Sequence, residues 1–163
     1  MSGRVRLGVS VIVIGGLAIG IAAGCASKSM SMAGSGDVVA DRQRLMKSVG
    51  ANWSDIQAKA KAGNIEGIAV NAEVLALDAQ RIPGLFPEGS ASDKSKAKPE
   101  IWQRWSEFEA AAKNLENQAE KLREAAKAKN EQLTQDMVKT FGRDACGPCH
   151  TPFRQPPPAA PRS

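Results

Sequence analysis

Two cysteines and a histidine near the C-terminus have types and spacing that can bind a cofactor. They lie in the run Cys146-Gly147-Pro148-Cys149-His150, which has the Cys-x-x-Cys-His spacing of a covalent haem attachment site. The two thiols add across the haem vinyl groups, and the histidine becomes the proximal iron ligand. On a helix all three side chains project from one face. We therefore expect one covalent haem c, with thioethers at Cys146 and Cys149 and iron ligation by His150.

Two other chemistries use a similar motif. Cys-Gly-Pro-Cys is also the dithiol of thioredoxin-like oxidoreductases, where it lies near a βαβ pattern. Here the motif follows a helical pattern, and only a short segment with the run Pro156-Pro157-Pro158 comes after it. A zinc site needs four ligands, whereas His150 is the only histidine. A zinc site is one alternative to haem, and a thiol oxidoreductase is a remote one.

The N-terminus has the pattern of an export signal. Arg4 and Arg6 precede an apolar run that ends in small residues, as in a secretory signal peptide. The end of that run, residues 21–25, resembles a bacterial lipobox, in which the cysteine, here Cys25, is lipidated and becomes the new N-terminus. An uncleaved anchor is the alternative, because the apolar run is marginally long enough to span a bilayer. Both predict a domain in the periplasmic space that is tethered to a bacterial membrane.

Charge and cysteine count fit an exported haem protein. The three cysteines are used by one lipidation and two thioethers, so no free thiol remains. The chain of 163 residues has a net charge of +5, which falls to +3 when Arg4 and Arg6 leave with a signal peptide. The basic residues are spread along helices, so the sequence does not favour a nucleic-acid partner.

The rest of the chain is predicted to form four amphipathic helices, because apolar residues recur every three or four positions. These helices are expected over residues 37–62, 65–82 and 99–126, and from about 130 towards the haem motif. We predict an all-α fold, an antiparallel four-helix bundle with the cofactor in its core near the C-terminus. The heptad pattern of the third helix is also compatible with an intermolecular coiled coil. The link over 83–98 is long, and should either cross the bundle or cover part of the site.

Two prolines affect the last helix. Pro148 lies inside the haem motif, where it removes a backbone hydrogen bond and should kink the helix unless a new turn begins there. Pro152 adds a second break. The thiols and His150 should still be placed, within an altered helix geometry.

Four groups of residues make the sequence similar to the class II c-type cytochromes, the cytochrome c-prime family and its low-spin relatives of the cytochrome c-556 type. They are Arg42-Gln43 with Leu45-Met46-Lys47, Leu85-Phe86-Pro87, Pro99-Glu100-Ile101-Trp102, and the haem motif followed by Phe153-Arg154. The resemblance covers about residues 38–154 and implies a four-helix bundle with covalent haem. It also implies that Arg42 lies near the haem propionates and that Arg154 lies on the proximal side.

The same resemblance gives Met46 a role. In the low-spin relatives a methionine at this position is the distal iron ligand, whereas five-coordinate members have a non-ligating residue, often leucine. A core methionine is the alternative for a Met at helical spacing. His/Met ligation raises the reduction potential and suits reversible electron transfer. Trp53, Trp102 and Trp105 are expected to be core aromatic residues.

The sequence thus predicts a membrane-anchored, periplasmic mono-haem electron carrier with redox proteins as partners, and not an enzyme. The alternative is a five-coordinate haem protein that binds nitric oxide or carbon monoxide. Many relatives pair as dimers, so a homodimer is an assembly that the sequence allows. The expected parts are a signal peptide (1–24), lipidated Cys25 with a spacer (25–36), the bundle (37–154) and a proline-rich disordered tail (155–163).

Overall fold

The computed structural model describes residues 36–156, which are mostly helical. The helices are α1 (Val38–Lys61), α2 (Ile68–Arg81), α3 (Glu100–Gln103), α4 (Trp105–Lys127), α5 (Glu131–Phe141) and α6 (Gly147–Phe153). A 3₁₀ turn (Pro83–Leu85) follows α2, and a π-helical segment (Gly142–Cys146) joins α5 to α6. Within 36–156 the only β-type pairing is an isolated bridge between Ala97 and Arg154. The predicted signal peptide, Cys25 and most of the proline-rich tail lie outside the described residues.

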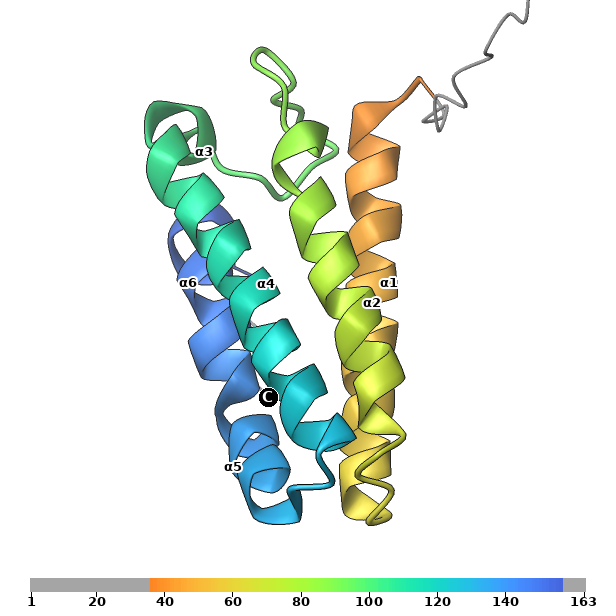
Figure 1. Cartoon of the computed structure of the whole chain (residues 1–163). Coiled ribbons are helices and arrows are strands. Elements are labelled where there is room, and N and C mark those ends of the chain that lie inside the picture. The colour runs from red at the N-terminus through yellow and green to blue at the C-terminus, as the bar shows by residue number, and fades with distance from the viewer. Residues whose placement is uncertain (1–35, 157–163) are drawn as a thin grey trace, which may run out of the picture. The chain divides into compact units, whose positions relative to one another are not determined.

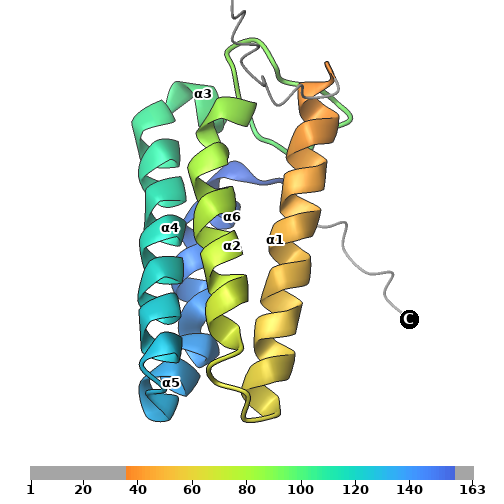
Figure 2. The ribbon, with the colours of Figure 1, turned by 45° about the vertical axis from the view of Figure 1, so that its right-hand side comes forward.

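The helices of residues 36–156 form rods that run side by side in alternating directions (Figures 1 and 2). Three rods are α1, α2 and α4, and the fourth is α5 continued through the π-helical segment into α6. The α2 helix packs against both α1 and α4, and α4 also packs against α5 and α6. This arrangement confirms the predicted antiparallel four-helix bundle. None of the described helices is long and apolar enough to cross a membrane.

Side-chain caps set two of the helix starts that the sequence predicted. The Asp37 carboxylate accepts hydrogen bonds from two backbone N–H groups of the first turn of α1, at 2.9 and 3.1 Å. Asn130 caps α5 by accepting from the Leu133 N–H at 3.1 Å. These oxygens satisfy N–H groups that have no partner within the helix. After α1 the chain turns at Gly63, whose φ of 70° is a conformation that glycine adopts without steric cost.

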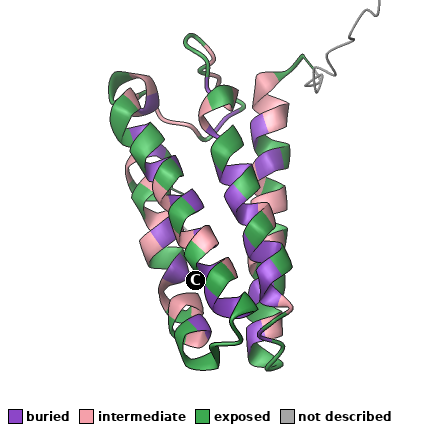
Figure 3. Ribbon diagram, viewed as in Figure 1, coloured by how far each residue is buried: buried purple, intermediate pink, exposed green. Residues whose placement is uncertain are grey.

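Buried side chains recur along the long helices between exposed ones (Figure 3) and form one apolar core. The largest of those with almost no exposure include Ile56, Ile68, Leu75, Phe108 and Leu122. Burying one such side chain stabilises the fold by about 1.5–3 kcal/mol. Buried alanines are frequent on α2 and α4, and small side chains let two helix backbones approach closely.

Aromatic rings connect the chain's two halves. Trp53 of α1 stacks on Phe141 at the end of α5, with ring centroids 4.9 Å apart and planes 20° apart. The ring centroid of Phe108 on α4 lies 4.8 Å from that of Phe86 and 5.5 Å from that of Phe153 on α6, and both ring pairs have edge-on geometry. All three tryptophans are partly buried and packed against the core, which confirms their prediction as core aromatic residues.

The heptad pattern predicts a single helix over 99–126, and this prediction is wrong at its start. The chain leaves the helical region at Arg104 (φ −125°, ψ 48°), which separates α3 from α4. The contacts of α3 give the physical reason: the Trp102 indole N–H donates to the carbonyls of Phe86 and Pro87, at 3.1 and 3.0 Å. The loop thus holds α3, while α4 follows the direction of the bundle.

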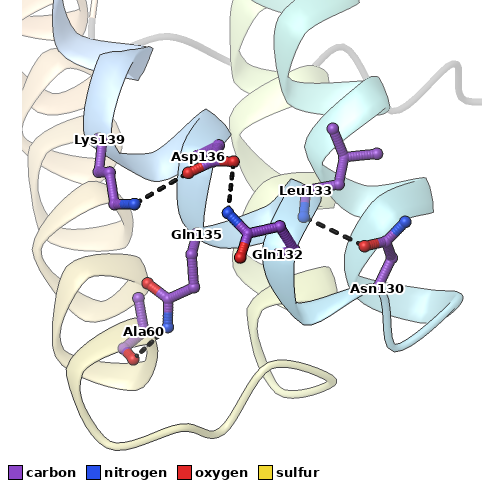
Figure 4. Close-up of polar contacts among 7 residues, drawn as sticks. All are labelled: Ala60, Asn130, Gln132, Leu133, Gln135, Asp136 and Lys139. Atoms are coloured by element: carbon purple, nitrogen blue, oxygen red, sulfur yellow. Dashed lines mark hydrogen bonds and ion pairs between the residues drawn. The ribbon is translucent and has the colours of Figure 1, made fainter.

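One polar contact joins α5 to the end of α1, and others lie within α5 and at its start (Figure 4). The Gln135 amide donates to the carbonyl of Ala60 at 2.8 Å, one of the last carbonyls of α1, which also accepts from the Gly63 N–H at 3.2 Å. Within α5, Asp136 accepts from Gln132 at 2.7 Å and from Lys139 at 2.8 Å. Such pairs within a helix are worth roughly 0.2–0.5 kcal/mol each.

Truncating a core leucine should cost far more stability than truncating an exposed one. We expect Leu122→Ala to lower the free energy of unfolding by about 2–5 kcal/mol, because it opens a cavity at a fully buried position. The control is Leu133→Ala on α5, where the side chain is 48% exposed and the loss should be about 0.5 kcal/mol or less. Guanidinium unfolding followed by circular dichroism measures both. Equal losses would contradict the described core.

Candidate haem site

A cavity of about 300 Å³ lies between α1, the loop over 83–98, α4 and the last helix. All six residues of the bundle that the sequence singled out for haem binding line it: Arg42, Met46, Cys146, Cys149, His150 and Arg154. Most of the other lining residues are apolar, and include Val49, Ile82, Phe86, Ala97, Ile101, Phe108, Ala111, Ala112, Leu115, Ala145 and Phe153. An apolar cavity with a few convergent polar groups is the usual form of a cofactor site.

The end of the last rod presents the attachment motif to this cavity. Cys146 is the last residue of the π-helical segment, and Cys149 and His150 lie in α6. Both thiols are half-buried and packed against the apolar core. The fold thus places the two thiols and the imidazole along one cavity wall, as attachment of a flat cofactor requires.

Pro148 is accommodated in the way that keeps the motif helical. The π-helical segment ends just before it and α6 starts at Gly147, so Pro148 lies in the first turn of a new helix. The first N–H groups of a helix have no partner within it, so proline costs little there. Pro152 lies inside α6, which ends one residue later at Phe153. The expected helix break therefore takes the form of a π-to-α transition within the motif.

The electrostatics of the motif suit haem attachment and disfavour dithiol exchange. Burial raises the pKa of the Cys146 thiol, and burial together with the neighbouring Cys146 raises the pKa of Cys149 to about 11. Exchange needs a thiolate, and both groups are protonated near neutral pH. Partial burial, with the positive charge of Arg154, lowers the pKa of His150, so its ring is neutral, as a metal ligand must be.

The zinc alternative needs a cluster of ligands. Among residues 36–156 no group of three or more His, Cys, Asp or Glu side chains is placed to hold a metal ion. The imidazole of His150 instead faces a cavity whose other walls carry few polar atoms.

Met46 lines the cavity from α1, on a different helix from His150. Its side chain is half-buried and packed against the core, and the preceding residue, Leu45, is fully buried. One turn further along α1, Val49 lines the same wall. The thioether of Met46 is therefore on the cavity-facing stripe of α1, where a distal iron ligand would have to be.

Arg42 has a structural role that the sequence did not indicate. It is only 3% exposed, and its guanidinium donates to the Leu85 carbonyl and to both the carbonyl and the hydroxyl of Ser90. It also lies over the ring of Phe86, 4.3 Å from the centroid, a favourable cation–π geometry. Burial lowers the pKa of Arg42. The side chain thus fastens the loop to α1 in addition to lining the cavity.

Every charged side chain that lines the cavity is basic. Arg42 is buried, whereas Lys47, Lys96 and Arg154 are exposed at the rim. Arg154 is held by its bridge to Ala97, and the next residue donates its N–H to the Lys96 carbonyl at 2.8 Å. Basic groups around an apolar slot fit a cofactor with an apolar ring and two carboxylates.

The sequence did not identify the loop residues of the site. Ser95, Lys96 and Ala97 line the cavity, so of the two alternatives for the 83–98 loop, covering the site is the one observed. Ala111 and Ala112 also line the cavity and were not identified from the sequence. The run Ala110-Ala111-Ala112, in a helix that also buries larger side chains, indicates that space is left beside it. The thiols, the imidazole, the basic rim and the small-residue walls together fit haem c, and define a haem-binding four-helix bundle.

Comparison with known proteins gives the family. The model of the family described as Cytochrome C' matches residues 37–154. Cytochrome c-556 of Agrobacterium tumefaciens is 29% identical over 119 residues, which cover 71% of this chain and 95% of that protein. Cytochrome c' of Pararhodospirillum photometricum is 30% identical over 118 residues, which cover 70% and 93%. The chain belongs to the cytochrome c' family, and haem c is its covalent cofactor.

Solved structures share the fold. One is the nitric oxide complex of a variant of cytochrome c prime from Alcaligenes xylosoxidans, with a TM-score of 0.66 and 22% identity, covering 75% of this chain and 96% of that one. Another is a cytochrome c' with ligand-controlled dimer dissociation, with a TM-score of 0.65 and 24% identity, covering 73% and 95%. Both likenesses show the same helical bundle.

Removing the Arg42 side chain should loosen the loop that covers the site. We expect Arg42→Leu to speed hydrogen exchange of the backbone amides over 85–97 by roughly tenfold or more, because hydrogen bonds from a charged donor to two loop residues are lost. Mass spectrometry of exchanged peptides measures the effect. Arg44→Leu is the control, since Arg44 is exposed on the same helix and pairs with Asp41. Unchanged exchange in the Arg42 variant would show that the loop does not depend on this side chain.

Proposed function

We propose that this cytochrome c' family protein is an electron carrier whose haem iron is ligated by His150 and Met46. The observation that carries the proposal is that Met46 lines the haem cavity from α1 while His150 lines it from α6. A thioether and an imidazole are the axial pair that raises the reduction potential of a c-type haem. If these two side chains hold the iron, electron exchange would require no exchange of ligand.

Two further observations support ligation by Met46. The side chain is unbranched and has three rotatable bonds, so it can adjust its reach within a half-buried position. The relative from Agrobacterium tumefaciens is a cytochrome c-556, the low-spin type that the flanking residues Leu45 and Lys47 resemble.

A second function, binding of nitric oxide or carbon monoxide to an iron with an open axial position, is favoured by the packing around Met46. The cavity wall beside it is largely apolar, which suits a small uncharged ligand in place of the thioether. The Alcaligenes xylosoxidans relative with the same fold binds nitric oxide in a variant form. Coordination state therefore separates the two functions.

We also propose that the protein is attached to a bacterial membrane in the periplasmic space through a lipid on Cys25. The support is the sequence pattern of an export signal followed by the lipobox-like residues 21–25. Redox proteins are the proposed partners. The exposed basic rim formed by Lys47, Lys96 and Arg154 favours partners with acidic docking surfaces. Val70 and Leu77 are exposed one heptad apart on α2, which is compatible with pairing of two copies.

Substitution of Met46 tests the distal ligand. If its thioether binds the iron, Met46→Leu converts a low-spin haem, with sharp split bands in the dithionite-reduced absorption spectrum, into a high-spin haem that binds carbon monoxide. Met137→Leu is the matched control, because Met137 is also half-buried but lies on α5 and does not line the haem cavity. That variant should keep the wild-type spectrum.

The wild-type spectrum separates the two functions before any substitution is made. Low-spin bands that do not change with carbon monoxide agree with electron transfer. A broad high-spin spectrum that shifts with carbon monoxide, unchanged by Met46→Leu, would replace the electron-carrier proposal with gas binding.

Substitution of Cys25 tests the anchor. We expect the full-length wild-type protein, expressed in a host that matures lipoproteins and c-type cytochromes, to sediment with membranes and to incorporate labelled palmitate. Cys25→Ser should lose the palmitate label while keeping covalent haem staining, because Cys146 and Cys149 are intact. Retention of the label by Cys25→Ser would contradict lipidation at this residue, whereas loss of haem staining would indicate an export defect.

A further inference from the structure

Pro148 removes one backbone donor from the middle of the haem attachment motif. In a continuous α-helix the N–H of residue 148 would donate to the carbonyl of residue 144, four positions earlier. Proline has no N–H, so the Asp144 carbonyl cannot obtain its α-helical partner. This carbonyl lies two residues before Cys146, in the π-helical segment that leads into the motif.

A side chain from another helix donates to this same carbonyl. The amide nitrogen of Asn114, on α4, donates to the Asp144 carbonyl oxygen at 2.7 Å, in a partly buried contact. Asn114 lies beside the haem cavity on α4, because Ala111, one turn before it, and Leu115, the next residue, both line the cavity. The carboxylate of Asp144 does not take part, since it pairs with Arg143 at 2.6 Å.

We propose that Asn114 is a positioning residue for haem attachment: its amide supplies, from α4, the hydrogen bond that Pro148 withdraws from the helix. The bond fixes the distance between the motif and the α4 wall of the cavity. It thereby sets where Cys146 and, one turn on, His150 meet the cofactor. This inference depends on covalent haem attachment and is independent of the identity of the distal ligand.

The backbone around Asp144 explains why an external bond is needed there. The Gly147 N–H donates to the Gly142 carbonyl, a π-type spacing that is wider than an α-helical turn. A π-helical segment and a proline therefore follow each other within a few residues, and the α-helical ladder is interrupted between them. A partly buried carbonyl left without a donor destabilises the folded state, because it has lost its contacts with water and gained no partner. Asn114 satisfies it from α4, a helix of 23 residues packed against α2 and α5.

An ordinary contact between helices would stabilise the bundle whatever residue stands at 148. Asn114 is instead needed because residue 148 is proline. Pro148→Ala restores a backbone N–H that can reach the Asp144 carbonyl. The effect of removing the Asn114 amide should then largely disappear.

A double-mutant cycle on the haem-loaded protein tests this coupling. The variants are Asn114→Leu, which keeps the shape but has no donor, Pro148→Ala, and the two combined. With Pro148 present, we expect Asn114→Leu to raise the equilibrium constant for guanidinium unfolding roughly tenfold and to shift the reduction potential and the haem absorption bands. In the Pro148→Ala background, the same substitution should change the unfolding constant by about twofold or less. Gln118→Met, one turn further along α4 and also half-buried, is the matched control and should show no such dependence.

Equal effects of Asn114→Leu in the two backgrounds would overturn the proposal, as would an unchanged haem spectrum in the Pro148 background. If Pro148→Ala does not accumulate with haem, exchange of side-chain amide protons in the wild-type ferrous protein decides the matter. Protection of the Asn114 amide protons relative to those of exposed Asn117 is the expected result. Exchange at the same rate would show that the bond to Asp144 does not hold in solution, and would reject the positioning role.

Discussion

Small side chains keep one part of this bundle open for a flat cofactor. Alanines at 111, 112 and 145 line the cavity, whereas elsewhere the core is filled by residues such as Ile56, Ile68 and Leu122. Protein interiors are otherwise packed to nearly crystalline density, so the space beside these alanines fits a bound group. The surrounding structure holds its walls in place: α2 and α4 pack closely beside it, and the aromatic ring of Phe108 contacts both Phe86 of the loop and Phe153 of α6.

The loop over 83–98 completes the site and is held by a buried arginine. The guanidinium of Arg42 is buried beneath aromatic rings and donates to loop oxygens, so its desolvation is offset by hydrogen bonds and by the ring contact. The middle of the loop is therefore attached to α1 by a side chain, in addition to the chain connections at its two ends. The same side chain adds a positive charge to a cavity whose other charged residues are also basic, which favours a cofactor that carries carboxylates.

The parts of the structure that the sequence predicted are those determined by local chemistry. Asp37 and Asn130 are visible as helix starts because a capping side chain acts on the next few N–H groups. The spacing of the apolar residues predicts the four-helix bundle. The Cys-x-x-Cys-His motif identifies three residues of one cavity wall. The break at Arg104 was not predictable, because its cause is the bond from Trp102 to carbonyls some fifteen positions away. The partners of Arg42 are more than 40 positions distant, so nothing local indicates them. The π-helical segment also has no local signal beyond the proline that follows it.

The covalent nature of the attachment has a consequence for the unfolded chain. The thioethers of a covalent haem c survive denaturant, so the polypeptide does not release its cofactor when the helices melt. Loss of the cofactor is then no part of unfolding, so dilution does not shift the equilibrium by cofactor release, as it does for a protein that binds its cofactor reversibly. The denatured ensemble also contains a large apolar group tethered beside Phe153, which favours compact conformations at the end of the chain. Of the described helices, α6 is thus the one that keeps a hydrophobic partner even in the unfolded chain.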